Sequence, residues 1–383
     1  MCVVFLLPSS WHPGIRKRVR ALQQAGIEAT VLAFERSYHP NRALPHDYTI
    51  LGNLENTRYW QRLWPFIKAI PKIRAAAIGA RAIYAFGLDL LLLAWLSRFA
   101  LRPAPKLIYE VRDIRAVLTS QGIVARLLRS LERFLLRRID LLVTTSMAYV
   151  TGYFQGWQHM GGVPFQVVEN KLEAGWLPLV EQDRQPMADG VLRIGYFGLL
   201  RCPRSWEILK RAAERGEGRI QVYLRGIPVG LPNLAEEARA TPNIEYGGPF
   251  TAPDDLPSIF AQVDMVWACY GYEGERVGNW CWARTNRFYE SCFFRRPMFS
   301  QLGNEDGRVV KALGLGLALD LSDVDGSVER ILRVTAADIW AWQRKLSQLP
   351  MKLYVHSDEH ERLAQAILGE TQDGANAKCA SFC

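Results

Sequence analysis

The sequence has no apolar run long enough to cross a bilayer. The stretch 90–96 is apolar, but it is far shorter than the roughly 20 residues that a spanning helix needs. Residues 1–8 also lack the charged start and the cleavage site of a secretory signal peptide. We therefore expect a cytoplasmic chain that does not cross a membrane, although it can lie against one.

Motifs for metals and redox cofactors are also missing. The seven cysteines are odd in number and irregularly spaced, without a CxxC pair, which predicts reduced thiols rather than a zinc site or a disulfide framework. There is neither a P-loop nor a GxGxxG fingerprint. Asp323 and Asp325 have the spacing of a DxD metal motif, but they stand between a strand-like and a helix-like segment, where helix capping is the favoured interpretation. We expect no bound metal and no cofactor.

Positive charge is unevenly distributed along the chain. The formal net charge is +9, but residues 1–150 hold 22 basic and 9 acidic side chains, and the remainder has a small acidic excess. A basic first half predicts an anionic partner, such as a phosphate-bearing substrate, an anionic membrane surface or a nucleic acid, unless it is only a solvated face.

Strand-like and helix-like segments alternate along the 383 residues, which are too many for one hydrophobic core. This alternation predicts an α/β fold of two doubly wound, Rossmann-like domains with parallel sheets. We expect a first domain at 1–175, a linker at 176–190 and a second domain at 191–350. A C-terminal helix at 351–370 that packs back on the first domain and a flexible tail at 371–383 would follow. Ligands of such sheets lie in the loops after the strands.

One candidate loop follows the predicted strand 192–197. A strand ending near Gly198 leads into a basic loop with Arg201 and Arg204, and Ser205 can cap the next helix. A glycine that permits close approach, a helix N-terminus and two arginines are suited to holding a diphosphate. The alternative is a tight turn with solvated arginines.

A second candidate loop precedes the predicted strand 298–300. Thr285 or Asn286 can cap a helix, which gathers Arg284, Thr285, Asn286 and Arg287 at its positive end. Glu290 follows about one turn later, where its carboxylate could accept hydrogen bonds from sugar or ribose hydroxyls. Otherwise Glu290 is an ordinary surface carboxylate.

The stretch 286–298, NRFYESCFFRRPM, resembles the donor-site signature of family-4-like GT-B glycosyltransferases. Residues 198–201 are similar to the diphosphate loop of that family, and 11–26 to its first helix. Segments 110–113, 145–146 and 168–171 resemble loops of its bacterial exopolysaccharide and capsule members. The resemblance implies a GT-B fold, two domains facing across a cleft, and a UDP- or GDP-linked sugar as donor substrate. It implies that Glu290 grips the nucleotide ribose.

The sequence departs from that family at one position. The family has a Glu-x7-Glu pair, and Glu290 matches its second glutamate, whereas Trp282 stands at the first. Glu273 and Glu275 lie upstream and would substitute only in a rearranged loop. Because the first glutamate contacts the donor sugar in the family, this departure leaves the sugar and the stereochemistry open.

Two polar residues of the first half follow predicted strands. His12 and Asp113 therefore point toward the predicted cleft, and with Glu290 they are our candidate catalytic residues. Asp113 suits the general base of an inverting enzyme, whereas a retaining enzyme would rely on electrostatic help to the departing diphosphate. We favour the retaining, metal-independent reaction. Helix capping is the alternative role for both residues.

Two basic amphipathic segments predict contact with an anionic inner membrane surface. Arg126, Arg129, Arg133 and Arg137 form one helical stripe opposite Leu127, Leu128, Leu131 and Leu135, and Lys68 and Lys72 lie among apolar residues of another helix. The acceptor would then be a glycan, favoured as lipid-linked. Rival functions are an inverting transferase such as a glucuronosyltransferase, a nucleotide-sugar epimerase of GT-B shape, and a nucleic-acid-binding protein. The last lacks any recognisable module, so we expect no nucleic-acid partner.

Overall fold

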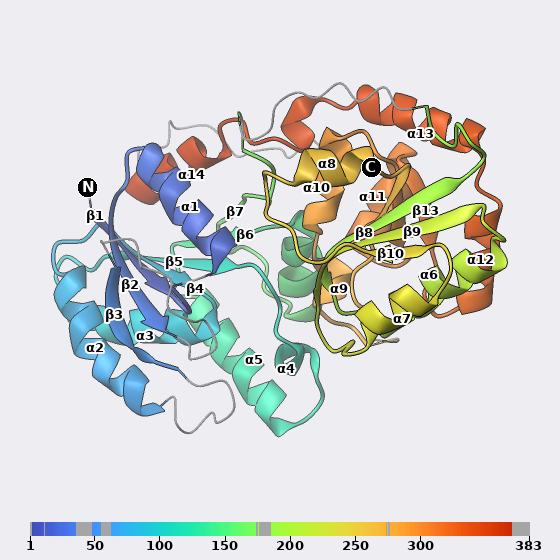
Figure 1. Ribbon diagram of the computed structural model, residues 1–383. Helices are drawn as coiled ribbons and strands as arrows, with labels where there is room; N and C mark the ends of the chain where they lie inside the picture. Colours follow the sequence, from blue (N-terminus) through green and yellow to red (C-terminus); the bar gives the residue numbers. More distant parts are fainter. Residues whose placement is uncertain are drawn as a thin grey trace. The chain divides into compact units, whose positions relative to one another are not determined.

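The chain folds into two compact units. The computed structural model describes residues 2–10, 12–35, 48–54, 63–173, 175, 185–272, 274 and 276–369. One unit comprises Met1–Glu169 and Asp358–Cys383, and the other comprises Asn170–Ser357 (Figure 1). The division after Glu169 falls a few residues before the predicted boundary at 175, and the described part of the predicted linker belongs to the second unit. The rest of that linker and the predicted tail lie outside the described residues.

The first unit is built on a seven-stranded sheet in the order β3-β2-β1-β4-β5-β6-β7, and every pairing between neighbours is parallel. The strands are β1 (Cys2–Leu7), β2 (Glu28–Glu35), β3 (Tyr48–Asn53), β4 (Ala82–Phe86), β5 (Lys106–Val111), β6 (Leu141–Thr144) and β7 (Phe165–Val167). The strand order reverses between β1 and β4, so the ligand-binding crevice of such a sheet is expected at their carboxyl ends.

Helices cover both faces of this sheet. They are α1 (Pro13–Gln24), α2 (Leu63–Ala77), α3 (Leu88–Arg98), α4 (Ala116–Thr119), α5 (Ile123–Leu136), a π-helix at Tyr149–Trp157 and α14 (Glu359–Leu368). Neighbouring α2, α3 and α5 lie on one side, and α14 packs beside α1 (Figure 1). Leu363, Ala364 and Ile367 of α14 share an apolar core with Val3 and Phe5 of β1. Helix α14 therefore completes the core of the first unit.

The second unit repeats the architecture with a six-stranded sheet in the order β10-β9-β8-β11-β12-β13, again with parallel pairings. Its strands are β8 (Leu192–Leu200), β9 (Ile220–Pro228), β10 (Ile244–Tyr246), β11 (Met265–Trp267), β12 (Met298–Gln301) and β13 (Gly316–Leu319). Its helices are α6 (Pro203–Arg215), α7 (Leu234–Ala240), α8 (Leu256–Ala261), α9 (Asn279–Trp282), α10 (Asn286–Phe293), α11 (Glu305–Leu313), α12 (Val324–Leu332), α13 (Ala336–Ser347) and a 3-10 turn at Met351–Leu353. Here the order reverses between β8 and β11.

Several sequence expectations about local structure are corrected. The helix α2 runs unbroken through Pro71, although a proline inside a helix commonly interrupts it. The edge strands β3 and β10 were not anticipated. Leu127, which the sequence pattern places opposite the arginine stripe of α5, is 63% exposed, because the buried side of that helix is formed by Ala125, Glu132, Leu135 and Leu136. No helix among the described residues is both long and apolar enough to span a bilayer.

Candidate functional site

The reversal point of the second sheet lies between β8 and β11, and the predicted glycine loop meets it there. We expected Gly198 in a loop after the strand. Instead it lies inside β8, which continues to Leu200 in register with β9. Gly198 and its partner Gly226 both have positive φ, 102° and 144°, and a Cβ on Gly226 would lie 1.8 Å from the carbonyl oxygen of Gly198. Only glycine permits this close approach of two backbones. The pair therefore fixes the path of the chain into the basic segment that follows.

The two arginines of that segment lie over tyrosines from the neighbouring strand end. The Arg201 guanidinium is 4.7 Å from the ring centre of Tyr270, and Arg204 is 5.4 Å from that of Tyr272. Arginine stacks well on aromatic faces, so both cations are held at the carboxyl ends of β8 and β11. The two arginines that the sequence predicted for a diphosphate therefore lie together. The two tyrosines beneath them were not predicted from the sequence.

The cap of α6 differs from the prediction. Cys202, not Ser205, is the N-cap, and its Sγ accepts hydrogen bonds from the backbone N–H groups of Ser205 and Tyr272, each at 3.3 Å. The physical reason is Pro203, which occupies the first helical position and so assigns the cap to the residue before it. Buried Cys202 thereby ties the start of α6 to the loop after β11.

The second predicted cluster forms at the start of α10. Thr285 caps the helix, accepting from the N–H of Phe288 at 3.3 Å, and its own N–H donates to Asp306 Oδ2 at 2.9 Å. Arg284 donates to Glu305 at 3.0 Å and lies 3.5 Å from Asp306. Asn286 is exposed. The predicted cap is confirmed, and the cluster is closed from the other side by two acids of α11.

Glu305 and Asp306 were missed by sequence reasoning, because acids in the first turn of a helix are common. Asp306 is completely buried, and this burial raises the pKa of its carboxyl to about 6, against the opposing effect of Arg284. The sequence signal that could have indicated these two acids is the Asn304 cap, whose Oδ1 accepts from the N–H of Gly307 at 2.7 Å and fixes the start of α11. Asp306 orients the backbone of Thr285 and hence the start of α10.

Glu290 lies one turn into α10 and is not a surface carboxylate. It is 5% exposed and forms a two-point ion pair with Arg287, with N–O distances of 2.6 and 2.7 Å. Arg287 also faces the ring of Phe250, in the loop after β10, at 5.6 Å. Two-point pairing fixes both side chains in one plane. Contact of Glu290 with ribose hydroxyls stays a prediction, and such a contact would be made by an already oriented carboxylate.

The first unit presents His12 and Asp113 after its strands. His12 is the N-cap of α1, where its Nδ1 accepts from the N–H of Ile15 at 3.3 Å, so the capping alternative holds for this residue. Asp113 is exposed in the connection between β5 and α4, and the N-cap of α4 is Arg115 instead. Both residues follow carboxyl ends of the first sheet, as expected. Their catalytic roles stay predictions.

A buried ionic centre lies beside them that sequence reasoning did not find. Glu110, at the end of β5, accepts from Tyr84 Oη at 2.5 Å and from Arg112 Nη1 at 3.0 Å, and Arg18 Nε approaches it to 3.4 Å. Burial and the carboxylate raise the pKa of Tyr84 far above its usual value, so its hydroxyl stays protonated and donates. A Cβ on Gly14 would lie 2.7 Å from Arg112 Nη2. Arg112 is thus confined between Glu110 and the start of α1.

The arginine stripe of α5 is partly occupied by contacts within the unit. Arg129 donates to the carbonyls of Leu118 and Ser120, both at 2.9 Å, and Arg133 donates to Gln158 at 3.2 Å. Arg126 and Arg137 are exposed. On α2, Lys68 lies over Trp64 at 5.1 Å and Lys72 donates to the carbonyl of Ile50 at 3.3 Å. The partners of Arg129, Arg133, Lys68 and Lys72 named here are carbonyls, an amide and a ring, none of which carries a negative charge.

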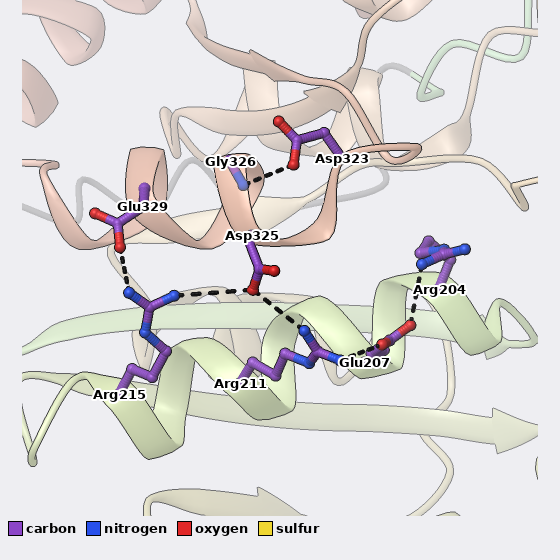
Figure 2. Close-up of polar contacts among 8 residues, drawn as sticks. All are labelled: Arg204, Glu207, Arg211, Arg215, Asp323, Asp325, Gly326 and Glu329. Atoms are coloured by element: carbon purple, nitrogen blue, oxygen red, sulfur yellow. Dashed lines mark hydrogen bonds and ion pairs between the residues drawn. The ribbon is translucent and has the colours of Figure 1, made fainter.

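The DxD-like pair has structural roles (Figure 2). Asp323 caps α12, accepting from the N–H of Gly326 at 2.9 Å, as the capping interpretation predicted. Asp325 pairs with Arg211 at 3.2 Å and with Arg215 at 4.0 Å, in a ladder of alternating charges that joins α12 to α6 (Figure 2). The ladder begins at Arg204, which pairs with Glu207 at 3.3 Å. One end of it therefore reaches the candidate diphosphate site.

Two doubly wound parallel units, each with its polar residues at the reversal point, define a protein of the GT-B fold, as predicted. No protein-family model matches the chain. It is similar, at 27% identity over 332 residues, to the succinoglycan biosynthesis protein ExoL of Rhizobium meliloti, with 84% of this chain and 82% of the relative covered. That relative agrees with the predicted resemblance to proteins of bacterial exopolysaccharide synthesis.

Solved structures agree on the fold. Anabaena Alr3699/HepE in complex with UDP superposes with a TM-score of 0.65 at 15% identity, covering 97% of this chain and 98% of its own. WaaG, a glycosyltransferase involved in lipopolysaccharide biosynthesis, gives a TM-score of 0.61 at 13% identity, covering 96% of this chain and 100% of its own. These likenesses confirm the predicted GT-B fold.

Proposed function

We propose that this chain transfers a sugar from a nucleotide-diphosphate sugar to a glycan acceptor in bacterial exopolysaccharide biosynthesis. The observation that carries the proposal is the meeting of Arg201 and Arg204, held over Tyr270 and Tyr272, with the N-terminus of α6 at the reversal point of the second sheet. A helix N-terminus and two guanidinium groups stabilise a diphosphate both when it binds and when it departs with negative charge. The likeness to ExoL supports the biosynthetic context.

The donor is proposed to be UDP-linked. The HepE structures that resemble this chain were determined with UDP and with UDP-glucose, which supports a uridine nucleotide here as well. In this chain Arg284, Thr285, Asn286, Arg287 and Glu290 would complete the nucleotide site, with Glu290 oriented by Arg287 to accept from ribose hydroxyls.

A panel of nucleotide sugars tests this assignment. A ligand at about 100 times its dissociation constant adds about 2.7 kcal/mol to the free energy of unfolding, so the true donor should raise the melting temperature clearly. UDP and a UDP-sugar are expected to stabilise the chain, and GDP, ADP and their sugars to have less effect. Stabilisation by none of the nucleotides would reject the proposed function.

We propose a retaining, metal-independent reaction in which the arginines stabilise the leaving diphosphate. We expect full activity in excess chelator. NMR should show that an axial donor anomer gives an axial product anomer, and Asp113→Asn should continue to turn over. Loss of turnover in Asp113→Asn with an inverted anomer would instead support Asp113 as general base.

The acceptor is proposed to be lipid-linked and reached at the inner face of the plasma membrane. Exposed Arg126 and Arg137 of α5, with Lys68 and Lys72 of α2, lie on helices that also expose Leu127 and Trp64. Basic and apolar side chains together favour peripheral binding to anionic lipid. Cosedimentation with anionic and neutral vesicles at two salt concentrations is the direct assay, and equal binding to both would argue against membrane attachment.

A further inference from the structure

A basic cavity lies on the first unit, at the edge of the sheet opposite to His12 and Asp113. It has a volume of about 390 Å³ and is lined by Trp95, Arg98, Phe99, Arg102 and Arg138, among others. Trp95 and Arg98 lie in the last turn of α3, Phe99 and Arg102 in the connection from α3 to β5, and Arg138 in the connection from α5 to β6. Both connections enter their strands at the amino edge of the sheet. The cavity is therefore separate from the carboxyl edge, where substrates of such sheets bind.

The charges around this cavity favour an anion. Of its three arginines, Arg98 faces Asp140 at 3.4 Å, and Asp140 also accepts from the N–H of Leu107 at 2.7 Å. Arg102 and Arg138 donate instead to main-chain carbonyls, those of Leu101 at 2.9 Å and Phe134 at 2.7 Å. A carbonyl contact orients a guanidinium without neutralising it, and most of its N–H donors remain for a ligand.

The arginine on the α5 side is held in place by aromatic packing. The Arg138 guanidinium lies 3.5 Å from the ring centre of Phe134, which in turn meets the ring of Trp95 edge-on at 5.3 Å. A cation stacked in this way has few alternative positions. One side of the cavity is thus formed by a positively charged side chain, Arg138, that is exposed to solvent and already held in position.

Apolar side chains stand exposed at the same edge. Phe99 is 75% exposed and Ile78, directly after α2, is 70% exposed. Arg74 of α2 donates to the carbonyl of Phe99, which links the ends of α2 and α3. Large apolar groups in water are unfavourable by about 25 cal/mol for each Å² that a partner would cover. A small soluble anion would fill the cavity but leave these side chains in water. A lipid would place its charged headgroup in the cavity and its acyl chains against the apolar side chains.

We infer that this cavity binds the phosphate headgroup of an anionic phospholipid, with Phe99 and Ile78 inserted among the adjoining acyl chains. The inference rests on the proposed function, to which it adds a specific lipid site beyond the general basic surface of α2 and α5. The second unit offers a contrast. A cavity of about 410 Å³ at its own amino edge is lined by Glu245 and by Arg193, which pairs with Asp189 at 2.5 Å, so it has no comparable excess of positive charge.

Vesicle binding by a double variant tests the site. Arg102→Gln with Arg138→Gln is compared with the matched control Arg333→Gln with Arg344→Gln, which removes two exposed arginines of the second unit. On phosphatidylcholine vesicles containing phosphatidylglycerol, the cavity variant should partition roughly 30-fold less than wild type, since each basic residue near an anionic surface contributes about 1 kcal/mol. The control should bind like wild type. Equal binding of the two variants would overturn the site.

Soluble probes separate a lipid site from a free-anion site. Dihexanoyl phosphatidylglycerol below its micelle concentration should bind the wild type saturably by calorimetry, bind the cavity variant far more weakly, and outcompete inorganic phosphate. Phe99→Ser should weaken binding of the short-chain lipid and leave phosphate unaffected. Phosphate binding as tight as that of the lipid, or the absence of saturable lipid binding in the wild type, would overturn the inference.

The test is independent of the donor site. UDP should raise the melting temperature of the cavity variant as much as that of wild type, because Arg102 and Arg138 belong to the first unit and the donor residues to the second. Failure of UDP to stabilise any form would count against the proposed function alone, whereas loss of lipid selectivity with UDP binding intact would count against the lipid site alone.

Discussion

Each unit buries a glutamate near the carboxyl edge of its sheet and pairs it with arginine, but the two pairs are built differently. Glu110 is met by Arg18, which lies 92 positions away in sequence, and by Arg112. Glu290 is met by Arg287 three residues earlier on the same helix. The first arrangement depends on the tertiary structure of its unit, and the second forms within α10. We infer that Glu110 serves stability and that Glu290 can exchange contacts with a ligand at little cost to the fold.

The largest effect is expected at Glu110. Glu110→Gln leaves Arg18, which is 3% exposed, without a carboxylate partner, and breaking a buried pair in this way costs about 3–5 kcal/mol. The free energy of unfolding, measured in urea, should fall by this amount. Asp89→Asn is the matched control, because its pair with Arg115 is partly exposed to solvent and such a pair is worth about 1 kcal/mol or less. Equal losses of unfolding free energy in the two variants would show that the buried pair stabilises the first unit no more than the exposed pair does.

The second unit should respond to pH through Asp306. Because burial raises the pKa of Asp306 from 3.8 to about 6, the folded chain binds a proton more tightly than the unfolded chain. This contribution to stability is present below about pH 4 and is lost as pH rises through about 6, by up to about 3 kcal/mol. Asp306→Asn should remove this pH dependence, which is obtained by subtracting its urea unfolding curves from those of wild type. Parallel pH profiles would show that the pKa of Asp306 is the same in the folded and the unfolded chain.

The donor site should be sensitive to Arg201. Arg201 is exposed, so Arg201→Ala should leave the fold intact while losing a charged contact to the diphosphate, worth about 1.5–3 kcal/mol in kcat/KM for the donor. Arg215→Ala, at the other end of α6, removes an arginine paired with Glu329 and should leave donor use unchanged. Wild-type kinetics in Arg201→Ala would move the diphosphate site elsewhere.

The smallest effect is expected from Gly14→Ala. Its added methyl group would meet Arg112 Nη2 at 2.7 Å and displace the guanidinium, at a cost of about 1–3 kcal/mol. If Arg112 helps to form an acceptor site, KM for the acceptor should rise while UDP affinity is unchanged. Gly161→Ala is the control, since nothing lies within 4 Å of the added Cβ there. A rise in KM for both variants, or for neither, would show that Arg112 does not help to form the acceptor site.

The central strands and the local caps could be predicted from the sequence, because their signals are contained in short stretches. Buried parallel strands such as β1 are uniformly apolar, and Thr285 stands directly before its helix. The edge strand β3 was missed because it includes Gly52 and polar residues and is only partly buried. Capping by Cys202 was missed because serine is the commoner cap, although Pro203 determines the position.

Long-range contacts could not be predicted in the same way. Nothing near Arg18 indicates that its side chain reaches Glu110 or donates to the carbonyl of Val168 at 2.6 Å. The stacking of Arg201 on Tyr270 likewise joins residues that follow β8 and β11, two strands that are adjacent only in the folded sheet. The sequence therefore indicated which segments carry the candidate site, and the tertiary structure determines which of their side chains meet.

The return of α14 to the first unit has a consequence for biosynthesis. Leu363 and Ile367 complete an apolar core whose members outside α14 lie between Val3 and Val168, and the whole of the second unit, Asn170–Ser357, is synthesised in between. At about 5–20 residues per second, the nascent first sheet waits roughly ten to forty seconds for its last helix. During that interval the face of α1 that α14 covers lacks its partner helix, and the core of the first unit stays incomplete until the second unit has been synthesised.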